Sequence, residues 1–283
     1  MYNRTIRLVA ANLSIEDNRI NFRIEKSVIN YPNLANIIIY NLSETNRKIL
    51  ETEGKTIQLY AGHEDAGTPL LFSGDIVNVI HFKDGPDWKT TLYCGDSSSV
   101  INTTTINKTI PAGTSMSSML NQLLEVVPDI KKGILTGVKN CLSKKESILH
   151  ALVMSGNVKD WLIKLSNDCG FDAYYDNGVF EALPKNLPVS DVPPVIINQA
   201  SGMIGSPERT EVGVNVKNLL LPELKLGRTI RIESINTLYS IGNLFFRKIP
   251  PIRNEGIYRM NKLIHFGDTH GNDWTTEIQG VNF

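Results

Sequence analysis

Several short stretches of the chain alternate hydrophobic with polar residues, which is the period of a β-strand with one buried face. In the first third, Ile57, Leu59 and Ala61 alternate with polar neighbours, and in the last third Ile230 and Ile232 do the same. Two further strands are predicted to place these residues on one face: Trp88, Thr90, Leu92 and Cys94 in one, and Trp274, Thr276, Ile278 and Gly280 in the other. The spacing therefore predicts a mainly β protein.

Three β-like patterns occur twice in the same order, which indicates an internal duplication. The first is a hydrophobic run that ends in Asn-Leu, the second is Gly, a basic residue and Thr-Ile, and the third is Ile-His-Phe, a turn and Asp-Trp. They occupy residues 37–42 and 214–219, 54–59 and 227–232, and 80–90 and 264–276, respectively. The duplication predicts two similar β-barrel or sandwich domains, each ending in an antiparallel hairpin. The alternative is that these segments are ordinary strands of one large β domain.

Ten residues carry this repeat, and we expect them to support the structure rather than to take part in chemistry. They are Asn41, Gly54, Ile57, Phe82 and Trp88 in the first copy, and Asn218, Gly227, Ile230, Phe266 and Trp274 in the second. The first copy is also predicted to hold a short helix, with Ser43 as its N-cap and Gly54 as its C-terminal stop.

The segment between the two copies changes to helical spacing. Apolar residues recur every three or four positions over residues 116–127, and again over residues 158–167 ahead of Gly170. Asn177-Gly178 then separates two strand-like runs, which is a strong hairpin signal. These patterns predict a small α+β insert.

The length of 283 residues suits two or three domains better than one. We expect a first β domain at residues 1–103, an α+β insert with two helices and a hairpin at 104–201, and a second β domain at 202–283. No run of apolar residues approaches the length of a membrane span, and no secretory signal is expected at the N-terminus.

Composition narrows the function further. Lys plus Arg and Asp plus Glu number 29 each, so the net charge is zero, which argues against a protein whose main task is to bind nucleic-acid phosphates. The three cysteines, Cys94, Cys141 and Cys169, are far apart, so neither a disulfide framework nor a zinc site is favoured. We expect folding in a reducing cytoplasm.

Motifs for enzyme chemistry are missing from the sequence. It contains no phosphate-binding glycine loop, no GxSxG elbow and no HExxH helix. His265, Asp268 and His270 could be imagined around a metal ion, but their spacing fits no recurrent site and a satisfied turn is the better interpretation. We therefore expect no catalytic residues, no metal and no cofactor.

One loop combines apolar and basic residues and is a candidate protein interface. Its residues are Phe245, Phe246, Arg247, Lys248 and Ile249, between prolines that favour an extended loop within the second copy. The alternative, equally open at this point, is a strand and turn packed on its own domain.

The chain resembles the hub proteins of phage tail baseplates over nearly its whole length. In the first copy the resemblance rests on residues 35–43, on Arg47 and Gly54, and on residues 60–62, 71–74 and 87–88. In the second copy it rests on residues 202–210, 213–214, 219–227, 264–268 and 272–274. It implies two tail-tube-like β domains per chain, and a structural homotrimer with a pseudo-six-fold outline. Such a hub joins the tail tube protein to the central spike protein, encloses the genome-delivery channel, and sits in the virion after assembly in the host cytoplasm.

Three alternatives remain open from the sequence. Within the structural class, the chain could serve as the hub of a phage-like contractile particle, such as a bacteriocin or a type VI secretion spike. From another class, it could be a β-rich protein that binds or degrades the cell envelope. Binding of single-stranded nucleic acid by the paired barrels is disfavoured, because the charge is neutral and only 7% of residues are aromatic.

Overall fold

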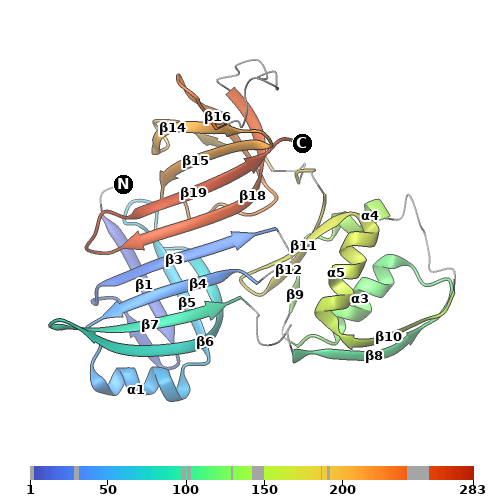
Figure 1. Ribbon diagram of the computed structural model, residues 1–283, viewed down its shortest axis with the longest axis horizontal. Coiled ribbons are helices and arrows are strands. Elements are labelled where there is room, and N and C mark those ends of the chain that lie inside the picture. Colours follow the sequence, from blue (N-terminus) through green and yellow to red (C-terminus); the bar gives the residue numbers. More distant parts are fainter. Residues whose placement is uncertain are drawn as a thin grey trace.

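In the computed structural model, residues 3–28, 32–96, 100, 103–128, 130–141, 150–185, 187–189, 192–240 and 255–283 are described. Most of them form β-strands, and fourteen strands belong to one sheet. Eight of these follow one another from β14 to β6 (Figure 1), and we call this run the continuous sheet. A small α+β unit lies at the side of this sheet. The prediction of a mainly β fold with an α+β insert is confirmed.

Among its described residues, the N-terminal unit comprises seven strands and one helix. They are β1 (Arg4–Ala10), β2 (Leu13–Ile15), β3 (Ile20–Ser27), β4 (Leu34–Tyr40), α1 (Glu44–Glu53), β5 (Thr56–His63), β6 (Leu70–Asp84) and β7 (Asp87–Gly95). Helix α1 begins where the Ser43 side chain accepts a hydrogen bond from the backbone N–H of Asn46, and it ends at Gly54, as predicted. A Cβ on Gly54 would lie 2.4 Å from the carbonyl oxygen of Leu50, so this close approach requires glycine.

The insert contains five strands and three helices among its described residues. They are β8 (Thr105–Ile110), α3 (Met116–Glu125), β9 (Lys131–Lys132), α4 (Thr136–Cys141), β10 (Leu152–Asn157), α5 (Val158–Cys169), β11 (Phe171–Asp176) and β12 (Val179–Pro184). Gly170 ends α5 in the left-handed conformation, and the β11–β12 hairpin turns at Asn177-Gly178, both as predicted. Cys169 forms a disulfide, whereas Cys94 is a buried free thiol. The cysteine spacing did not favour a disulfide framework, so the disulfide at Cys169 was not predicted.

In the part of the C-terminal unit that the structure describes there are seven strands. They are β13 (Val195–Ile197), β14 (Met203–Thr210), β15 (Gly213–Leu219), β16 (Thr229–Glu233), β17 (Leu238–Ser240), β18 (Glu255–Asp268) and β19 (Trp274–Val281). Strand β13 pairs with β16, so the chain enters this unit before the first strand of the repeat.

The two β units share one topology. The strand order β3-β4-β7-β6-β5 in the N-terminal unit matches β14-β15-β19-β18-β16 in the C-terminal unit, and every neighbouring pair is antiparallel. The predicted duplication is confirmed, and Trp88 and Trp274 lie on the equivalent strands β7 and β19.

The match extends to single residues. Strand β6 carries a bulge between Ile76 and Asn78, and β18 carries one between Met260 and Lys262. Because these bulges fall at the same place in the ladder, residue 76 corresponds to residue 260 and each later residue of β6 to the residue 184 positions further on. A repeated bulge is a conserved structural device rather than an accident of two unrelated sheets.

A His–Thr pair occurs in both units at equivalent positions, partly buried in the first unit and buried in the second. The Nδ1 atom of His81 lies 3.0 Å from the hydroxyl oxygen of Thr90. The Nδ1 atom of His265 lies 2.9 Å from the hydroxyl oxygen of Thr276. These contacts fix the alignment of β6 with β18 and of β7 with β19.

The alignment changes one part of the sequence interpretation. Ile39 pairs with Thr90, and Asn218 pairs with Thr276, so Asn218 corresponds to Ile39 and not to Asn41. The sequence motif is therefore displaced by two residues. A displacement of two leaves the buried face unchanged, because side chains alternate with period two.

Candidate assembly surfaces

The two β units join edge to edge within the chain. The C-terminal half of β18 pairs with β3 in antiparallel register from Lys262 opposite Ser27 to Asp268 opposite Asn21. The N-terminal half of β18 pairs instead with β16, inside its own unit. One long strand thus completes its own unit and also forms the connection, which we call the joint, to the other unit (Figure 1).

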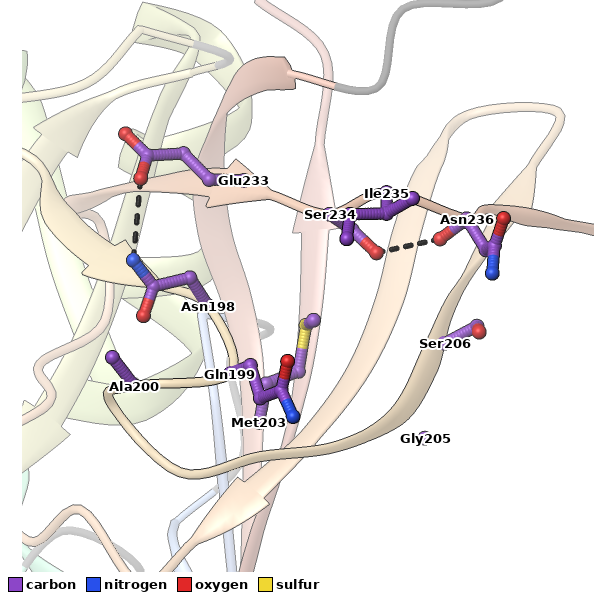
Figure 2. Close-up of a pocket in the computed structure, with 10 residues that line it drawn as sticks. All are labelled: Asn198, Gln199, Ala200, Met203, Gly205, Ser206, Glu233, Ser234, Ile235 and Asn236. Carbon is purple, nitrogen blue, oxygen red and sulfur yellow. Dashed lines mark hydrogen bonds between the residues drawn. The ribbon is translucent and has the colours of Figure 1, made fainter.

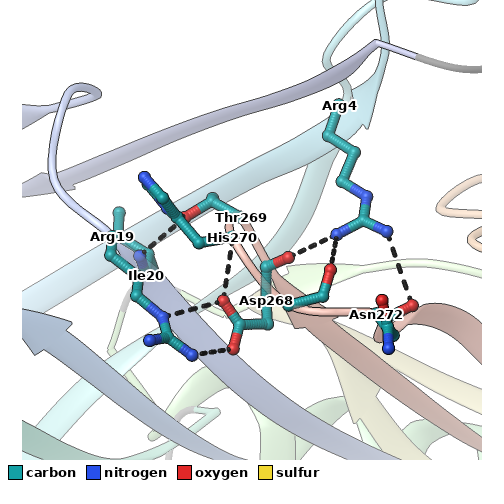
Figure 3. Close-up of polar contacts among 8 residues, drawn as sticks. Arg4, Arg19, Ile20, Asp268, Thr269, His270 and Asn272 are labelled. Atoms are coloured by element: carbon teal, nitrogen blue, oxygen red, sulfur yellow. Dashed lines mark hydrogen bonds and ion pairs between the residues drawn. The ribbon is translucent and has the colours of Figure 1, made fainter.

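Two arginines of the N-terminal unit hold the turn between β18 and β19 (Figure 3). Arg19 donates to both carboxylate oxygens of Asp268, with N···O distances of 3.1 and 2.6 Å. Arg4 donates to the backbone carbonyl oxygens of Asp268 and Gly271 at 2.6 and 2.5 Å. The turn is therefore fixed by a bidentate ion pair and by capped carbonyls, which give geometric specificity to the joint.

The charge state of Asp268 follows from this setting. Burial alone raises the pKa of a carboxyl group, but the hydrogen bonds from Arg19 and from the backbone amides of His270 and Gly271 outweigh it. The pKa of Asp268 is lowered from 3.8 to about 2. Asp268 is therefore ionised at neutral pH.

Trp274, which begins β19, is buried by the neighbouring unit. Its indole N–H donates to the carbonyl oxygen of Gly62 at 3.2 Å. The ring of Phe22 meets it edge-on at 5.6 Å between centroids, and the Arg4 guanidinium lies 5.5 Å from the ring centroid. Only 2% of Trp274 is exposed. This burial depends on the joint, since Gly62, Phe22 and Arg4 all belong to the other unit.

The insert docks beside the joint through two ion pairs with little solvent exposure. Asp176 of β11 lies 2.7 Å from the ammonium of Lys26 on β3, and Asp172 of β11 lies 2.8 Å from the guanidinium of Arg259 on β18. The side chains of Lys26 and Arg259 are 3% and 0% exposed. Strand β11 therefore contacts both β units with charged groups whose partners are buried.

The tip of the insert hairpin is held by the N-terminal unit. The Asp96 carboxylate accepts hydrogen bonds from the backbone amides of Asn177 and Gly178 at 2.6 and 3.1 Å. The side-chain amide of Asn33 donates to the carbonyl oxygen of Tyr175 at 2.6 Å. The Asn-Gly turn thus serves as an attachment point as well as a reversal of the chain.

The N-terminal unit exposes the surface that its counterpart uses in the joint. Ile80 and Phe82 of β6 are 48% and 44% exposed, and Trp88 of β7 is 38% exposed. Beyond Asp75, one edge of β6 pairs with β7, and among the described residues no strand pairs with the other edge. Large apolar side chains beside an unpaired edge indicate an interaction surface.

The opposite end of the sheet carries a second open feature. A cavity of about 1010 Å³, open to solvent, lies where β14 begins. Figure 2 shows its walls, with the loop before β14 on one side and the segment after β16 on the other. They are formed by Asn198, Gln199, Ala200, Met203, Gly205, Ser206, Glu233, Ser234, Ile235 and Asn236.

Most of the predicted repeat residues have a local structural role. Asn41 adopts a positive φ of 54° and receives a hydrogen bond from the backbone N–H of Trp88 at 3.0 Å on its side-chain oxygen. Gly227 has a positive φ of 74°, and a Cβ there would overlap the Leu183 side chain at 2.0 Å. Ile57 and Ile230 are buried in the cores of the two units. Phe82 and Trp88, in contrast, lie on the exposed surface described above.

The candidate interface loop at Phe245, Phe246, Arg247, Lys248 and Ile249 lies outside the described residues. It stays a prediction. The joint and the attachment of the insert carried no sequence motif, because they bring together residues that are far apart in the chain, such as Asp96 and Asn177 or Lys26 and Asp176.

From the sequence, His265, Asp268 and His270 were a conceivable metal site. No group of three His, Cys, Asp or Glu side chains in this part of the chain could hold a metal ion. Burial lowers the pKa of His265 to about 3, so that its ring is neutral, and the side chain is directed to Thr276. None of the helices that the structure describes is long and apolar enough to span a membrane.

Comparison with known proteins gives one family and a set of shared folds. The sequence profile of a family described as "Baseplate hub gp41" matches residues 5–240. No curated protein matches the chain in sequence.

Two solved tail proteins have the same fold along their whole length. The tail protein from Neisseria meningitidis MC58 gives a TM-score of 0.64 at 8% identity, covering 99% of this chain and 97% of that chain. The 43 kDa tail protein of prophage MuSo2 from Shewanella oneidensis gives 0.64 at 10% identity with the same coverages.

A third similar structure comes from another kind of machine. It is an E. coli component of the type VI secretion system, described as structurally similar to the T4 bacteriophage tail proteins gp27 and gp5. The TM-score is 0.60 at 9% identity, covering 98% of this chain and 76% of that chain. At such identities the likeness establishes the fold alone.

Proposed function

The chain belongs to the baseplate hub gp41 family, and from that premise we propose that it is a hub subunit that assembles into a homotrimeric ring with a pseudo-six-fold outline. The family indicates a structural role in the virion tail. In our proposal the ring connects the tail tube protein to the central spike protein and encloses the channel for genome delivery. Assembly takes place in the host cytoplasm.

The observation that carries this proposal is the edge-to-edge joint between two units of one topology. A protein that connects a six-fold tube to a three-fold spike must present six similar surfaces on one side and three on the other. Three chains with two equivalent units each meet both requirements. In this proposal the chain is divided as expected into a first β domain, an insert and a second β domain. The two β domains of each chain form neighbouring segments of the ring.

Size and symmetry in solution test the proposal. We expect light scattering of the purified chain, or of the chain mixed with its tube protein, to give the mass of three chains. Electron microscopy along the particle axis should show three-fold rings with a six-fold outline. A protein that stays monomeric in the presence of its tube and spike proteins, with no ring in assembled particles, would contradict the proposal.

A second candidate within the same structural class is the hub of another contractile particle. The E. coli type VI secretion component with this fold favours it. Purification of particles from the producing cells separates the two, since a phage hub copurifies with packaged DNA and a secretion or bacteriocin hub does not. Turnover of peptidoglycan by the purified chain would instead favour an envelope-degrading protein.

A further inference from the structure

We infer that β6 of one chain pairs with β14 of a second copy, and that the β6–β7 turn of the first chain seats in the cavity at the start of β14. This inference rests on the proposed ring and assigns the surface that closes it. The occupant of both the β6 edge and the cavity is a second copy of this chain.

The first argument concerns which strand edges of the two units are paired within the chain and which are left for a second copy. In each unit, the first repeat strand (β3 or β14) and the second half of the long strand (β6 or β18) lie at the two ends of a four-stranded segment. The joint uses β18 and β3. One edge of each kind, β6 and β14, is left at the two ends of the continuous sheet (Figure 1). These are the two edges that already pair in the joint, so a second copy can repeat the joint between chains.

The joint also supplies the register. In the joint, Phe266, His265 and Ile264 lie opposite Arg23, Ile24 and Glu25, respectively. In the N-terminal unit, the counterparts of Phe266, His265 and Ile264 are Phe82, His81 and Ile80. In the C-terminal unit, the counterparts of Arg23, Ile24 and Glu25 are Glu208, Arg209 and Thr210, which lie against β15 as the first three lie against β4. The pairing between chains therefore places Ile80 opposite Thr210 and Phe82 opposite Glu208.

Exposure supports the same surface. Trp274 is 2% exposed in the joint, whereas its counterpart Trp88 is 38% exposed. Ile80 and Phe82 are 48% and 44% exposed, whereas their counterparts Ile264 and Phe266 are partly buried. At all three positions the apolar residue of the N-terminal unit is more exposed than its counterpart beside the joint. A second copy docked as in the joint removes this apolar surface from water.

The cavity provides space for the β6–β7 turn of the neighbouring chain. In the joint, the backbone N–H of Thr269 donates to the carbonyl oxygen of Ile20 at 3.0 Å, so the β18–β19 turn lies at the start of β3. Met203 is the repeat counterpart of Ile20, and it lines the cavity. The β6–β7 turn, which corresponds to the β18–β19 turn, is thereby directed into the space in front of Met203 (Figure 2).

One element must move for this pairing to form. Strand β17 pairs in parallel with β14, with Leu238 opposite Glu208 and Ser240 opposite Thr210. These are the positions that β6 takes in the second copy. Strand β17 is only three residues long and Leu238 is 60% exposed, so few contacts oppose its release. In the free chain β17 covers the β14 edge, which protects an otherwise unpaired strand from unwanted partners.

The contact is head-to-tail, because it joins two different edges. Heterologous contacts of this kind generate a closed ring when the rotation per subunit divides a full turn. Cross-linking tests the register directly. In the full chain, Ile80→Cys together with Thr210→Cys should give bands of two and three linked chains with a short bismaleimide, in samples shown to be trimeric by light scattering.

Matched controls make the result specific. Ile80→Cys with Lys217→Cys places the second thiol one strand further away, and each single variant reports the background from the native cysteines. We expect at least a tenfold lower yield from these. Trimers that do not cross-link through Ile80→Cys and Thr210→Cys would overturn the pairing and leave the ring intact, whereas the absence of trimers under assembly conditions would overturn both.

A second experiment tests the release of β17. Glu208→Cys with Leu238→Cys, oxidised to a disulfide, should lock β17 onto β14 and reduce the trimer fraction at least tenfold, with recovery on reduction. The parent chain under the same oxidising and reducing conditions is the control, since it contains its own disulfide at Cys169. A locked chain that assembles as readily as the parent would overturn the direct pairing of β6 with β14.

Discussion

Asp268 shows how a single residue sets the geometry of the joint. Its carboxylate binds Arg19 in a bidentate pair and accepts a backbone hydrogen bond from His270 at 2.9 Å. The Asp268 side chain is 8% exposed, whereas Arg19 is 41% exposed. The pair is thus partly buried, and it contributes more than a surface ion pair does.

We predict that Asp268→Asn lowers the free energy of unfolding by about 1–3 kcal/mol at pH 7, because it removes the charge-assisted bonds to Arg19. The folded-state pKa is depressed to about 2 from 3.8. The contribution is therefore complete above pH 3.8 and is lost as the pH falls toward 2. Urea denaturation at pH 7 and pH 5 should give the same difference between variant and parent.

The repeat supplies the control for this variant. Asp84 is the counterpart of Asp268, but its side chain is 57% exposed and pairs with Lys89 on the surface. Asp84→Asn should change the free energy of unfolding by less than about 0.5–1 kcal/mol. Equal effects of the two substitutions would show that the joint does not stabilise the turn.

His265 predicts an acid sensitivity. Burial and the nearby charge of Lys26 lower its pKa to about 3, so the unfolded chain binds a proton below pH 6.5 that the native chain does not bind. Stability should then fall by up to about 1.4 kcal/mol per pH unit as the pH decreases from 6.5. Chemical denaturation at pH 5, 6 and 7.5 measures the free energy of unfolding, and its dependence on pH should be weaker in His265→Gln than in the parent.

His81→Gln is the matched comparison, since His81 holds the same position in the first repeat and is only partly buried. Its effect on the pH slope should be smaller. The same slope in both variants would contradict the assignment of the acid sensitivity to His265. His63, whose pKa is also lowered by burial, contributes equally to all three proteins.

Residue roles could be predicted from the sequence only where they depend on local chemistry. Ser43, Gly54 and Asn177-Gly178 were predicted correctly, because caps and turns are set by neighbouring atoms. The burial of Trp274 against the exposure of Trp88 could not be predicted. The two residues have similar neighbours in sequence, and only the adjoining unit distinguishes them.

At the scale of elements, the β11–β12 hairpin connects the insert to both β units. Its aspartates face cations that water does not reach, Lys26 on β3 and Arg259 on β18. Desolvation of such charges is costly, so each cation depends on its partner. The ion pairs of the hairpin therefore form only when the insert is docked beside the joint.

We predict that Asp176→Asn lowers the free energy of unfolding by about 3–5 kcal/mol, because the Lys26 ammonium is left buried without its counter-ion. Lys26→Met combined with Asp176→Leu should recover most of this loss, since no buried charge remains. Chemical denaturation measures both. As a control, Lys217→Gln breaks an exposed pair with Glu277 and should cost less than about 1 kcal/mol.

If Asp176→Asn proved as mild as Lys217→Gln, the pair would be hydrated in solution and would not fix the insert. A loss in the double variant equal to that of Asp176→Asn would point to packing of the hairpin rather than to charge.

Long, periodic elements could be predicted from the sequence, and short ones could not. Helices α1, α3 and α5 and the hairpins at the ends of both repeats follow from caps, spacing and turn residues. Strands β13 and β17 have three residues each, and α4 has six. Such segments are too short for a period to emerge, and their structure depends on a strand far away in the sequence.

At the scale of the whole molecule, the two ends of the continuous sheet differ in character. The β6 end carries exposed apolar side chains, and the β14 end carries the cavity and β17. A molecule with two unlike ends has a direction. This asymmetry agrees with a head-to-tail ring and not with a two-fold dimer, in which one surface meets itself.

We predict that Ile80→Glu with Phe82→Glu lowers the affinity between chains at least 100-fold, because it places charges in a surface that assembly removes from water. Analytical ultracentrifugation measures the shift from trimer to monomer. Val153→Glu is the control, since Val153 is 59% exposed but lies on β10 of the insert. Circular dichroism should show that the parent and both variants are folded.

Assembly that is unaffected by Ile80→Glu and Phe82→Glu, or equally weakened by Val153→Glu, would show that β6 is not part of the interface.

The repeat predicted the two β units and their similarity from sequence alone. Their edge-to-edge connection could not be predicted, since backbone hydrogen bonds between β18 and β3 place no requirement on residue type.

The joint has a kinetic consequence. Because β18 and β3 belong to one polypeptide, their encounter is intramolecular and does not slow on dilution. In a ring of three such chains, half of the contacts are already made before subunits meet. The yield of rings then scales with the third power of the chain concentration. For a ring of six separate single-unit subunits, the yield would scale with the sixth power of the subunit concentration. A covalently paired subunit can therefore nucleate a ring from few copies and act as the template on which a polymer of unlinked subunits starts.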